Sequence, residues 1–446
     1  MQKNLLVRFP PSPTGMLHIG NARVAFLNYL FAQKYGAKYI IRFDDTDTLR
    51  TKEEYKNAMI EDLQWLGIEF ANEPIYQTQR TDVYQDALQK LVKTGRIYEC
   101  FETKEELDVK RKVQNSRGLP LIYDRTALKV TAEQKKQYIN EGIVPYFRFK
   151  INNEEISWND GVQGKIVFQG SNISDPIVTR ADGSFMYAFC SIVDDFAMDV
   201  SHVIRGADHI TNTAVQSQMF DALNTAFNTS KQIEFLHLPL FQAKEGKISK
   251  RVGGFAIREL ASNGFEKKAI LNFLVNLGKS SFTDATLPLE DLIKQFDFKN
   301  YSKATVTFTH EVLENFNTKC LNSYEFHEIS QRLPNNIQKE FFDDFKGNIK
   351  KLEDINHWWN VASSKEFYHH DMKKEDSEFF IDYLGILQNN KEEDWSIQWS
   401  KSIKELKGKY PQRKGKQFFM PLRIGFSGMD HGIDLQTFTK WKLMDK

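Results

Sequence analysis

Residues 8–30 read RFPPSPTGMLHIGNARVAFLNYL, and the order of elements in this stretch decides the fold. An apolar run at Leu5 to Phe9 predicts a strand, the turn-forming PPSPTG follows it, and apolar side chains then recur at helical spacing from Ala22 to Leu30. Gly36 is placed to end that helix, and Tyr39 to Phe43 predict a second strand. A strand-loop-helix-strand unit predicts parallel strands joined by a right-handed crossover, which begins a doubly wound α/β sheet.

The rest of the chain divides by pattern into three parts. Between about residues 79 and 179, helical segments rich in Lys and Glu alternate with short strands and predict an α+β insertion. Strand and helix signals resume at His202 to Arg205 and at Thr213 to Phe227, so we expect the opening sheet to be completed after the insertion. From about Phe241 the pattern is predominantly helical to the end.

Composition and charge set broad limits on function. The 446 residues carry 60 Lys and Arg against 59 Asp and Glu, a formal net charge of +1, so nucleic-acid binding would need local basic patches. The three cysteines, Cys100, Cys190 and Cys320, lie too far apart for a disulfide framework or a four-thiolate zinc site. We find no signal-peptide pattern and no run near the ~18 apolar residues of a spanning helix. We therefore expect a cytoplasmic protein with no membrane partner.

Three charged residues are expected at the carboxyl ends of the predicted strands, where ligands bind in open α/β sheets: Arg8, Asp44 and Arg205. Two guanidinium groups and one carboxylate suit an amino acid that bears an extra acidic group. Arg offers a bidentate fork to a carboxylate, and Asp can accept from an ammonium group. The alternative is that each of the three is paired with a structural neighbour.

Two segments carry chemistry suited to phosphate. The loop from Pro11 to Asn21 opens into the first helix, where free backbone N–H groups attract phosphate, Gly20 lets a ligand approach and His18 adds a donor. The segment Lys247-Ile248-Ser249-Lys250-Arg251 lies between glycines, and Lys250 is a flexible point charge able to follow phosphate oxygens. The alternatives are a capping His and a solvated basic loop.

Taken together, the two segments resemble the HIGH and KMSKS signatures of class I aminoacyl-tRNA synthetases, and more narrowly those of bacterial glutamyl-tRNA synthetases. Further blocks carry the resemblance along the chain, and it reaches both ends: RFDDTDTLR at Arg42 to Arg50, MYAFCSIVDD at Met186 to Asp195, HVIRGADHITNT at His202 to Thr213, and FFMPLRIGFSGMDHG at Phe418 to Gly432.

The resemblance implies an ATP-dependent, Mg²⁺-accompanied reaction in which glutamate forms glutamyl-adenylate and then passes to the terminal adenosine of tRNA. Its glutamate-pocket positions correspond here to Arg8, Ser12, Asp44, Tyr187, Ser191 and Arg205. Its ATP-site positions correspond to Pro11, Ser12, His18, Gly20, Asn21, Lys247, Ser249 and Lys250. Of these, His18, Lys247 and Lys250 carry the catalytic roles. No covalent enzyme intermediate is implied, because the protein contributes alignment and charge stabilisation.

The chain departs from the family pattern at four positions. Asp44 stands where Glu is frequent, Ser191 where Asn is common, Ala207 where Glu is frequent, and Asn21 where the second His of the class-wide signature stands. These changes bear on amino-acid selection and leave the nucleotide site plausible. Some relatives hold zinc on closely spaced cysteines in the insertion. Here Cys100 stands alone with no nearby His, so we predict no zinc.

The resemblance also implies a domain order. A Rossmann-like (HUP-type) α/β catalytic domain is expected at residues 1–80 and 190–240, and an α+β acceptor-end-binding insertion at 81–189. A stem-contact domain with KISKR is expected at 241–310, and a mainly α-helical anticodon-binding domain at 311–446. The stretch from Lys401 to Lys416 holds seven cations against Glu405, which suits contact with phosphates or a solvated helix face about equally. We expect a monomer.

Three other functions are compatible with parts of the pattern. A truncated relative that attaches glutamate to a modified tRNA base lacks the region after KISKR, and a small-metabolite adenylyltransferase is generally much shorter. A silent paralogue has no chemical need for His18, Lys250 and both arginines. The sequence leaves open whether tRNA for glutamate, tRNA for glutamine or both are charged, because anticodon choice depends on shape and a few polar contacts.

Overall fold

The computed structural model describes residues 5–243, 255–282, 284–364 and 366–443. Contacts divide the chain into two compact units, Met1–Asn263 with Ile270–His310 and Gly264–Ala269 with Glu311–Lys446. The predicted residues Lys247, Ser249 and Lys250 lie outside the described part of the chain.

A parallel sheet of five strands forms the centre of the first unit, in the order β10-β9-β1-β2-β3. Its strands are β1 (Leu6–Phe9), β2 (Lys38–Phe43), β3 (Ile75–Tyr76), β9 (His202–Gly206) and β10 (Glu234–Leu238). Neighbouring strands pair in parallel throughout, with Arg8 opposite Ile40 and Arg205 opposite His237. The parallel sheet that the sequence predicts is thus confirmed, and so is its completion after the insertion.

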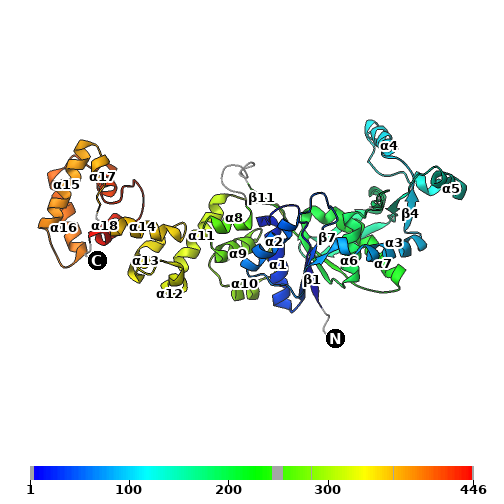
Figure 1. Ribbon diagram of the computed structural model, residues 1–446, viewed down its shortest axis with the longest axis horizontal. Coiled ribbons are helices and arrows are strands. Elements are labelled where there is room, and N and C mark those ends of the chain that lie inside the picture. The colour runs from blue at the N-terminus through cyan, green and yellow to red at the C-terminus, as the bar shows by residue number, and fades with distance from the viewer. Residues whose placement is uncertain (1–4, 244–254, 283, 365, 444–446) are drawn as a thin grey trace. The chain divides into compact units, whose positions relative to one another are not determined.

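Helix α1 (Ile19–Tyr35) packs against β1, β2 and β9 (Figure 1). It is buried on most sides, with Phe26, Leu27 and Leu30 fully enclosed, so packing between sheet and neighbours holds it rather than one apolar face. Gly36 ends the helix in the left-handed conformation with φ 65°, and its N–H bonds the carbonyl of Ala32. The predicted strand, helix and helix end are confirmed to within a few residues.

The inserted region combines helices with two small antiparallel sheets, which confirms its α+β character. One sheet has the order β4-β5-β8 and the other is the β6-β7 hairpin. Helices α4 and α5 bury none of their residues. The elements are α3 (Thr81–Lys93), β4 (Ile97–Cys100), α4 (Lys104–Ser116), α5 (Ala132–Asn140), β5 (Tyr146–Phe149), β6 (Glu155–Asp160), β7 (Gly164–Gln169) and β8 (Ile177–Thr179).

The inserted region shares a hydrophobic core with the helices that follow it. Tyr84 and Leu91 of α3 and Phe149 of β5 belong to one buried cluster with Phe189 of α6 and Leu223 of α7. The contact division accordingly keeps the insertion within the first unit. The other elements of this unit are α2 (Glu53–Trp65), α6 (Tyr187–Ala197), α7 (Ile210–Phe227), β11 (Phe241–Ala243), α8 (Ile257–Ser262), α10 (Leu289–Gln295) and β12 (Val306–Phe308); residues of α9 (Lys267–Asn276) belong to both units.

Helices form the second unit around a core rich in aromatic side chains, including Phe341, Phe345 and Tyr383. Its predicted helical character is confirmed. The helices are α11 (His310–Ser323), α12 (Phe326–Ile329), α13 (Lys339–Phe345), α14 (Glu353–Ser363), α15 (Lys374–Asn389), α16 (Trp395–Lys409), α17 (Lys416–Ser427) and α18 (Leu435–Leu443). None of the described helices has the length and apolar character that crossing a bilayer requires.

Candidate active site

A cavity of about 560 Å³ opens in the first unit at the carboxyl ends of β1, β9 and β10 and at the start of α1. Strand ends of this kind are where open α/β sheets bind ligands. Eight of the residues predicted from the sequence line this one cavity: Arg8, Pro11, Ser12, His18, Gly20, Asn21, Tyr187 and Arg205. The structure therefore brings together most of the described residues that the sequence singled out.

Arg205 brings a buried positive charge to the cavity. Its Nη2 donates to Thr213 Oγ1 at 2.5 Å and to Gln216 Oε1 at 2.7 Å, and both acceptors are neutral. Within the described part of the chain, no carboxylate forms an ion pair with it. Burial lowers the pKa of Arg205 to about 10, so the guanidinium stays charged near neutral pH. A buried cation without a carboxylate partner calls for an anionic ligand.

Arg8 lies in the same cavity and is only partly neutralised. Its Nε and Nη2 donate to the two carboxylate oxygens of Asp195, each at 3.1 Å. Its Nη1 is buried and has no hydrogen-bond partner among the described residues. An unused N–H group beside Arg205 gives the cavity a second donor for a carboxylate.

Asp44 and Ser191 do not line the cavity, contrary to the direct placement that the sequence suggests. Both side chains are buried and contact Arg42, whose Nε lies 2.8 Å from Asp44 Oδ1 and whose Nη2 donates to Ser191 Oγ at 3.3 Å. Arg42 Nη1 also lies 2.8 Å from Asp195 Oδ1. The structure shows Asp44 paired with its neighbour Arg42. Arg42 also contacts Asp195, which in turn binds Arg8, so these hydrogen bonds link Asp44 to Arg8.

Charge within this cluster is well compensated. Burial alone would lower the pKa of Arg42, but Asp44, Asp195 and Asp194 outweigh it and hold that pKa well above its ordinary value. Burial would likewise raise the pKa of Asp195, yet Arg8 and Arg42 keep it below its usual range. Asp195 therefore stays ionised and fixes the Arg8 side chain from behind.

His18 is the N-cap residue of α1. Its Nδ1 accepts from the Gly20 N–H at 3.0 Å, and desolvation lowers the pKa of the imidazole. The neutral ring therefore carries its proton on Nε2, and that N–H is the donor left for a ligand. The capping role and a ligand-binding role are thus compatible on the two nitrogens of one ring.

Gly20 lines the cavity and also leaves space for the imidazole of His18. A Cβ on this residue would lie 2.7 Å from Cε1 and 2.8 Å from Nδ1 of His18. The absence of a side chain therefore makes room for the capping imidazole. The contact that requires glycine in the structure is with His18.

The start of α1 also offers fewer free N–H groups than a bare helix end. Ile19 donates to the carbonyl of Phe255 at 2.9 Å, and Gly20 donates to the His18 ring. Within the first turn, this leaves the Asn21 N–H for a ligand among the described residues. The expected phosphate site is therefore narrower than the sequence implies.

Described residues on either side of KISKR lie at the cavity or beside it. Phe241 lies before the segment and lines the cavity. After the segment, Phe255 accepts from the Ile19 N–H at 2.9 Å, and Ile257 donates to the carbonyl of Leu17 at 2.8 Å. These two bonds pair Ala256 with His18 in an antiparallel bridge. Two stretches more than two hundred residues apart in sequence therefore meet beside one cavity.

Several residues that line the cavity were not predicted from the sequence. Asp208 and His209 follow β9 in a short 3₁₀ turn, and both lie on the wall with Phe241. Burial and the charge of Arg205 lower the pKa of His209. Asp208 and His209 follow Arg205 by three and four residues in the HVIRGADHITNT block. Their position just after the end of a predicted strand could have indicated that they line the site.

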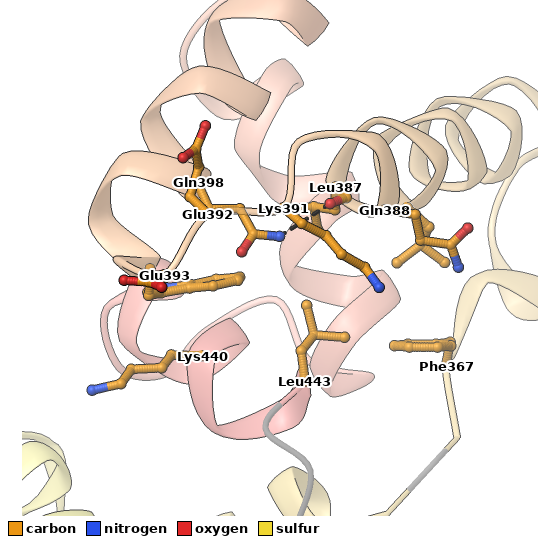
Figure 2. Close-up of a pocket in the computed structure, with 11 residues that line it drawn as sticks. Phe367, Leu387, Gln388, Lys391, Glu392, Glu393, Gln398, Lys440 and Leu443 are labelled. Atoms are coloured by element: carbon orange, nitrogen blue, oxygen red, sulfur yellow. Dashed lines mark hydrogen bonds between the residues drawn. The ribbon is translucent and has the colours of Figure 1, made fainter.

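A second cavity, of about 640 Å³, lies within the helical unit and contains none of the predicted site residues. Figure 2 shows side chains from α15, α16, α18 and the turn between α15 and α16 around it, with Gln398 donating to the Leu387 carbonyl at 3.0 Å. Lys391, Lys440, Glu392 and Glu393 all line this cavity, so residues of both charges contribute to its wall.

Cys100, the single cysteine near the insertion's strands, is fully buried. Tyr123 donates to Glu102 at 2.6 Å, and its hydroxyl lies 3.9 Å from the Cys100 sulfur. Burial raises the pKa of the Cys100 thiol to about 12, which disfavours the thiolate that metals require. The described residues include no group of three or more His, Cys, Asp or Glu that could hold a metal ion. The absence of zinc stays a prediction.

Comparison with known proteins agrees with this geometry. The family of class I tRNA synthetases (E and Q), catalytic domain, matches residues 4–315. "Glutamate--tRNA ligase 1" of Rickettsia akari is 41% identical over 443 residues, covering 97% of this chain and 95% of the relative. "Glutamate--tRNA ligase 2" of Orientia tsutsugamushi is 42% identical over 438 residues, with the same coverage.

A solved structure shows the same fold at full length. The crystal structure of a glutamate tRNA ligase from Elizabethkingia meningosepticum, in complex with its amino acid, superposes with a TM-score of 0.76 and covers 99% of this chain and 97% of that one, at 23% identity. The matched catalytic domain, the relatives aligned over nearly their whole length and the cavity at the strand ends lead to one conclusion: the chain belongs to the glutamate–tRNA ligase family of class I tRNA synthetases.

Proposed function

We propose that this chain attaches glutamate to tRNA in an ATP-dependent reaction that passes through glutamyl-adenylate. The observation that carries the proposal is Arg205, a buried cation held by neutral acceptors in the cavity that also contains His18. A dicarboxylic substrate can pair with this charge while its other carboxylate reacts with ATP, whereas an amino acid with a neutral side chain has no second carboxylate for it.

Glutamate binds between the two arginines in this proposal. Arg205 and the unused Nη1 of Arg8 receive the carboxylates, and Ser12 and Tyr187 complete the pocket wall. Asp44 and Ser191 act indirectly, because they hold Arg42 and through Asp195 fix Arg8.

ATP lies next to the start of α1. The Nε2–H of His18 and the Asn21 N–H bind phosphate oxygens, and Pro11 and Gly20 shape the loop around them. Lys247, Ser249 and Lys250 approach the phosphates from the segment whose neighbours on both sides lie at this cavity. Lys250 follows the charge as it moves between oxygens.

Mg²⁺ would accompany the phosphates of ATP at this cavity. Proteins usually hold this ion through one or two carboxylates together with the substrate phosphates. Asp208 is a carboxylate on the cavity wall, so the donor set fits such an ion. When bound, Mg²⁺ neutralises phosphate charge and assists departure of pyrophosphate.

The reaction needs no covalent bond to the protein. A glutamate carboxylate oxygen forms a bond to the α-phosphorus of ATP while the bond to pyrophosphate breaks. A ribose hydroxyl of the terminal adenosine then attacks the acyl carbon, and AMP leaves. The chain contributes alignment and charge stabilisation, and loss of one well-placed donor at such a site costs about 2.7–4 kcal/mol of transition-state stabilisation.

The chain is divided here into a catalytic fold and three regions that bind tRNA. We infer that the parallel sheet is a Rossmann-like (HUP-type) catalytic fold at residues 1–80 and 190–240. Residues 81–189 bind the acceptor end, 241–310 contact the stem, and 311–446 bind the anticodon. The family match to residues 4–315 and the helical second unit support this order. We expect the chain to act as a cytoplasmic monomer.

Charging assays test the proposal. The purified chain, ATP, Mg²⁺ and labelled glutamate are incubated with purified tRNA for glutamate or tRNA for glutamine. We expect acid-precipitable glutamate on at least one tRNA, and the pair of tRNAs decides which is charged. Charging of neither tRNA would overturn the proposal. ATP–pyrophosphate exchange that requires both glutamate and tRNA excludes a silent paralogue and a small-metabolite adenylyltransferase.

A further inference from the structure

A buried Asp–His pair lies behind Arg205. Asp160 ends β6 in the inserted region, His237 stands on β10, and Asp160 Oδ2 lies 2.5 Å from His237 Nδ1. Both side chains are fully buried, and neither lines the cavity. His237 is paired across the sheet with Arg205, so the pair lies directly beside the strand that carries the guanidinium.

Asp160 is held as a carboxylate with a fixed orientation. Its Oδ1 accepts three backbone N–H groups, from Val162 at 3.0 Å, Gln163 at 2.9 Å and His237 at 3.0 Å. Burial would raise the pKa of Asp160, but the hydrogen bonds from His237 and these amides outweigh it and lower the pKa to about 2. The Nδ1 of His237 therefore carries a proton and donates it to Oδ2.

The other imidazole nitrogen faces the arginine. His237 Nε2 lies 2.8 Å from Thr213 Oγ1 and 3.5 Å from Arg205 Nε. Burial, reinforced by Arg205, keeps the pKa of His237 below its usual value despite Asp160. The ring is therefore neutral, with its lone pair on Nε2. Together with Thr213 and Gln216, it surrounds the guanidinium with neutral acceptors.

We propose that Asp160 and His237 are positioning residues for the glutamate pocket: Asp160 fixes the tautomer of His237 so that Nε2 accepts on the Arg205 side and holds the guanidinium without neutralising it. The proposal rests on the glutamate-binding function assigned to Arg205. A carboxylate at the position of His237 would pair with the arginine and compete with substrate, whereas a neutral acceptor orients the arginine and leaves its charge for the ligand. The inserted region thereby supplies a residue that supports the amino-acid pocket.

Asp160→Asn tests the tautomer directly. The amide oxygen can keep the three backbone N–H groups, but the amide NH₂ then faces Nδ1 and moves the imidazole proton to Nε2. An Nε2–H group would now oppose the N–H of Arg205. We expect KM for glutamate to rise on the order of 10- to 100-fold, the range for a lost hydrogen bond to a charged group, with KM for ATP nearly unchanged.

The matched control is His237→Gln, whose side-chain amide offers an acceptor toward Arg205 whatever residue 160 is. In this background, Asp160→Asn should change KM for glutamate little, so the double-mutant cycle should show strong coupling. A merely structural Asp160 would instead alter the parameters for glutamate and ATP alike, and additive effects in the cycle would overturn the proposal.

A spectroscopic measurement separates this inference from the proposed function. In protein labelled with ¹⁵N-histidine, the His237 signals are assigned by their loss in His237→Gln. We expect a protonated Nδ1 and an unprotonated Nε2 in the unmodified chain, reversed in Asp160→Asn. A proton on Nε2 in the unmodified chain would overturn the inference even if Asp160→Asn fails to fold. Failure of the unmodified chain to charge any tRNA would instead overturn the proposed function and leave this tautomer measurement unaffected.

Discussion

At the scale of single residues, charge compensation separates the two kinds of buried arginine in the first unit. Arg42 is surrounded by carboxylates, whereas Arg205 is held by Thr213 and Gln216. The desolvation of an unpaired cation is costly, so a buried arginine that has no carboxylate partner is expected to bind an anionic ligand. The structure distinguishes the two roles although both residues stand near the ends of parallel strands in one sheet.

Replacing Arg205 tests the role of its charge. We expect Arg205→Ala to raise KM for glutamate by a factor equivalent to about 2–5 kcal/mol, because it removes one partner of a buried charge pair. The measurement is ATP–pyrophosphate exchange at varied glutamate. Arg96→Ala is the control, because Arg96 bonds the Lys150 carbonyl and Gln218 Oε1 away from the cavity. An unchanged KM for glutamate in Arg205→Ala would refute the assignment.

The three cysteines give a second prediction at this scale. All are buried, and burial raises the pKa of Cys100 to about 12 and that of Cys320 to about 11. Thiolates are the reactive form, so we expect none of the thiols to react with a disulfide reagent at about pH 8 while the chain is folded. All three should react after unfolding in guanidinium chloride. Rapid labelling of one thiol in the folded chain would contradict their burial.

At the scale of elements, the sequence was sufficient where neighbours in the chain carry the signal. The strand, loop, helix and strand from Leu6 to Phe43 follow from local periodicity and Gly36. The pairing of Arg42 with Asp44 also had a local signal, because Asp44 follows the end of β2 and stands only two residues after Arg42. A direct contact between Asp44 and a ligand stays a prediction.

Non-local contacts account for what the sequence could not show. Asp160 and His237 are 77 positions apart and stand in no recognisable motif, so their hydrogen bond had no sequence signal. The Ile19 N–H is used by Phe255, which follows the KISKR segment, and the sequence therefore overestimated the free N–H groups at the start of α1. The contact between Gly20 and the ring of His18 also had no signal in the sequence, because it depends on the folded position of that ring.

The two functions of His18 can be separated by substitution. His18→Ala removes the N-cap of α1, so it should lower the free energy of unfolding by about 1 kcal/mol. It should also slow adenylate formation. His18→Asn keeps a capping acceptor but lacks the Nε2–H donor, so it should restore stability and leave adenylate formation slow. Urea unfolding and ATP–pyrophosphate exchange report the two properties. Recovery of both in His18→Asn would show that the imidazole only caps the helix.

At the scale of the whole molecule, the near-neutral net charge makes RNA binding depend on local cations. In the basic stretch, Lys401, Lys409 and Arg413 are paired with carboxylates, as a solvated helix face would be. Lys407 lies over the rings of Phe418 and Phe419, whereas Lys404, Lys414 and Lys416 are exposed and have no ion pair within the described residues. These three lysines are therefore the ones in the stretch that suit contact with phosphates.

Salt dependence decides between the two interpretations of this stretch. If the three unpaired lysines bind phosphates, their joint replacement by Ala should weaken tRNA binding and reduce the slope of log affinity against log salt by about one for each lysine that binds a phosphate. Lys401→Ala is the control, because Lys401 is already paired with Glu392 at 3.0 Å. We expect the triple variant to lower the slope and the control to leave it unchanged. Equal slopes in both would assign the stretch to a solvated face.

We propose that one cavity holds the triphosphate and glutamate side by side. A stable glutamyl-adenylate analogue, in which a sulfamate replaces the acyl phosphate, tests it by competition in ATP–pyrophosphate exchange. Because the analogue spans both positions, we predict competition with ATP and with glutamate, and binding at least about 100-fold tighter than either substrate. Competition with only one of the two substrates would mean that they bind in separate places, and it would contradict the claim.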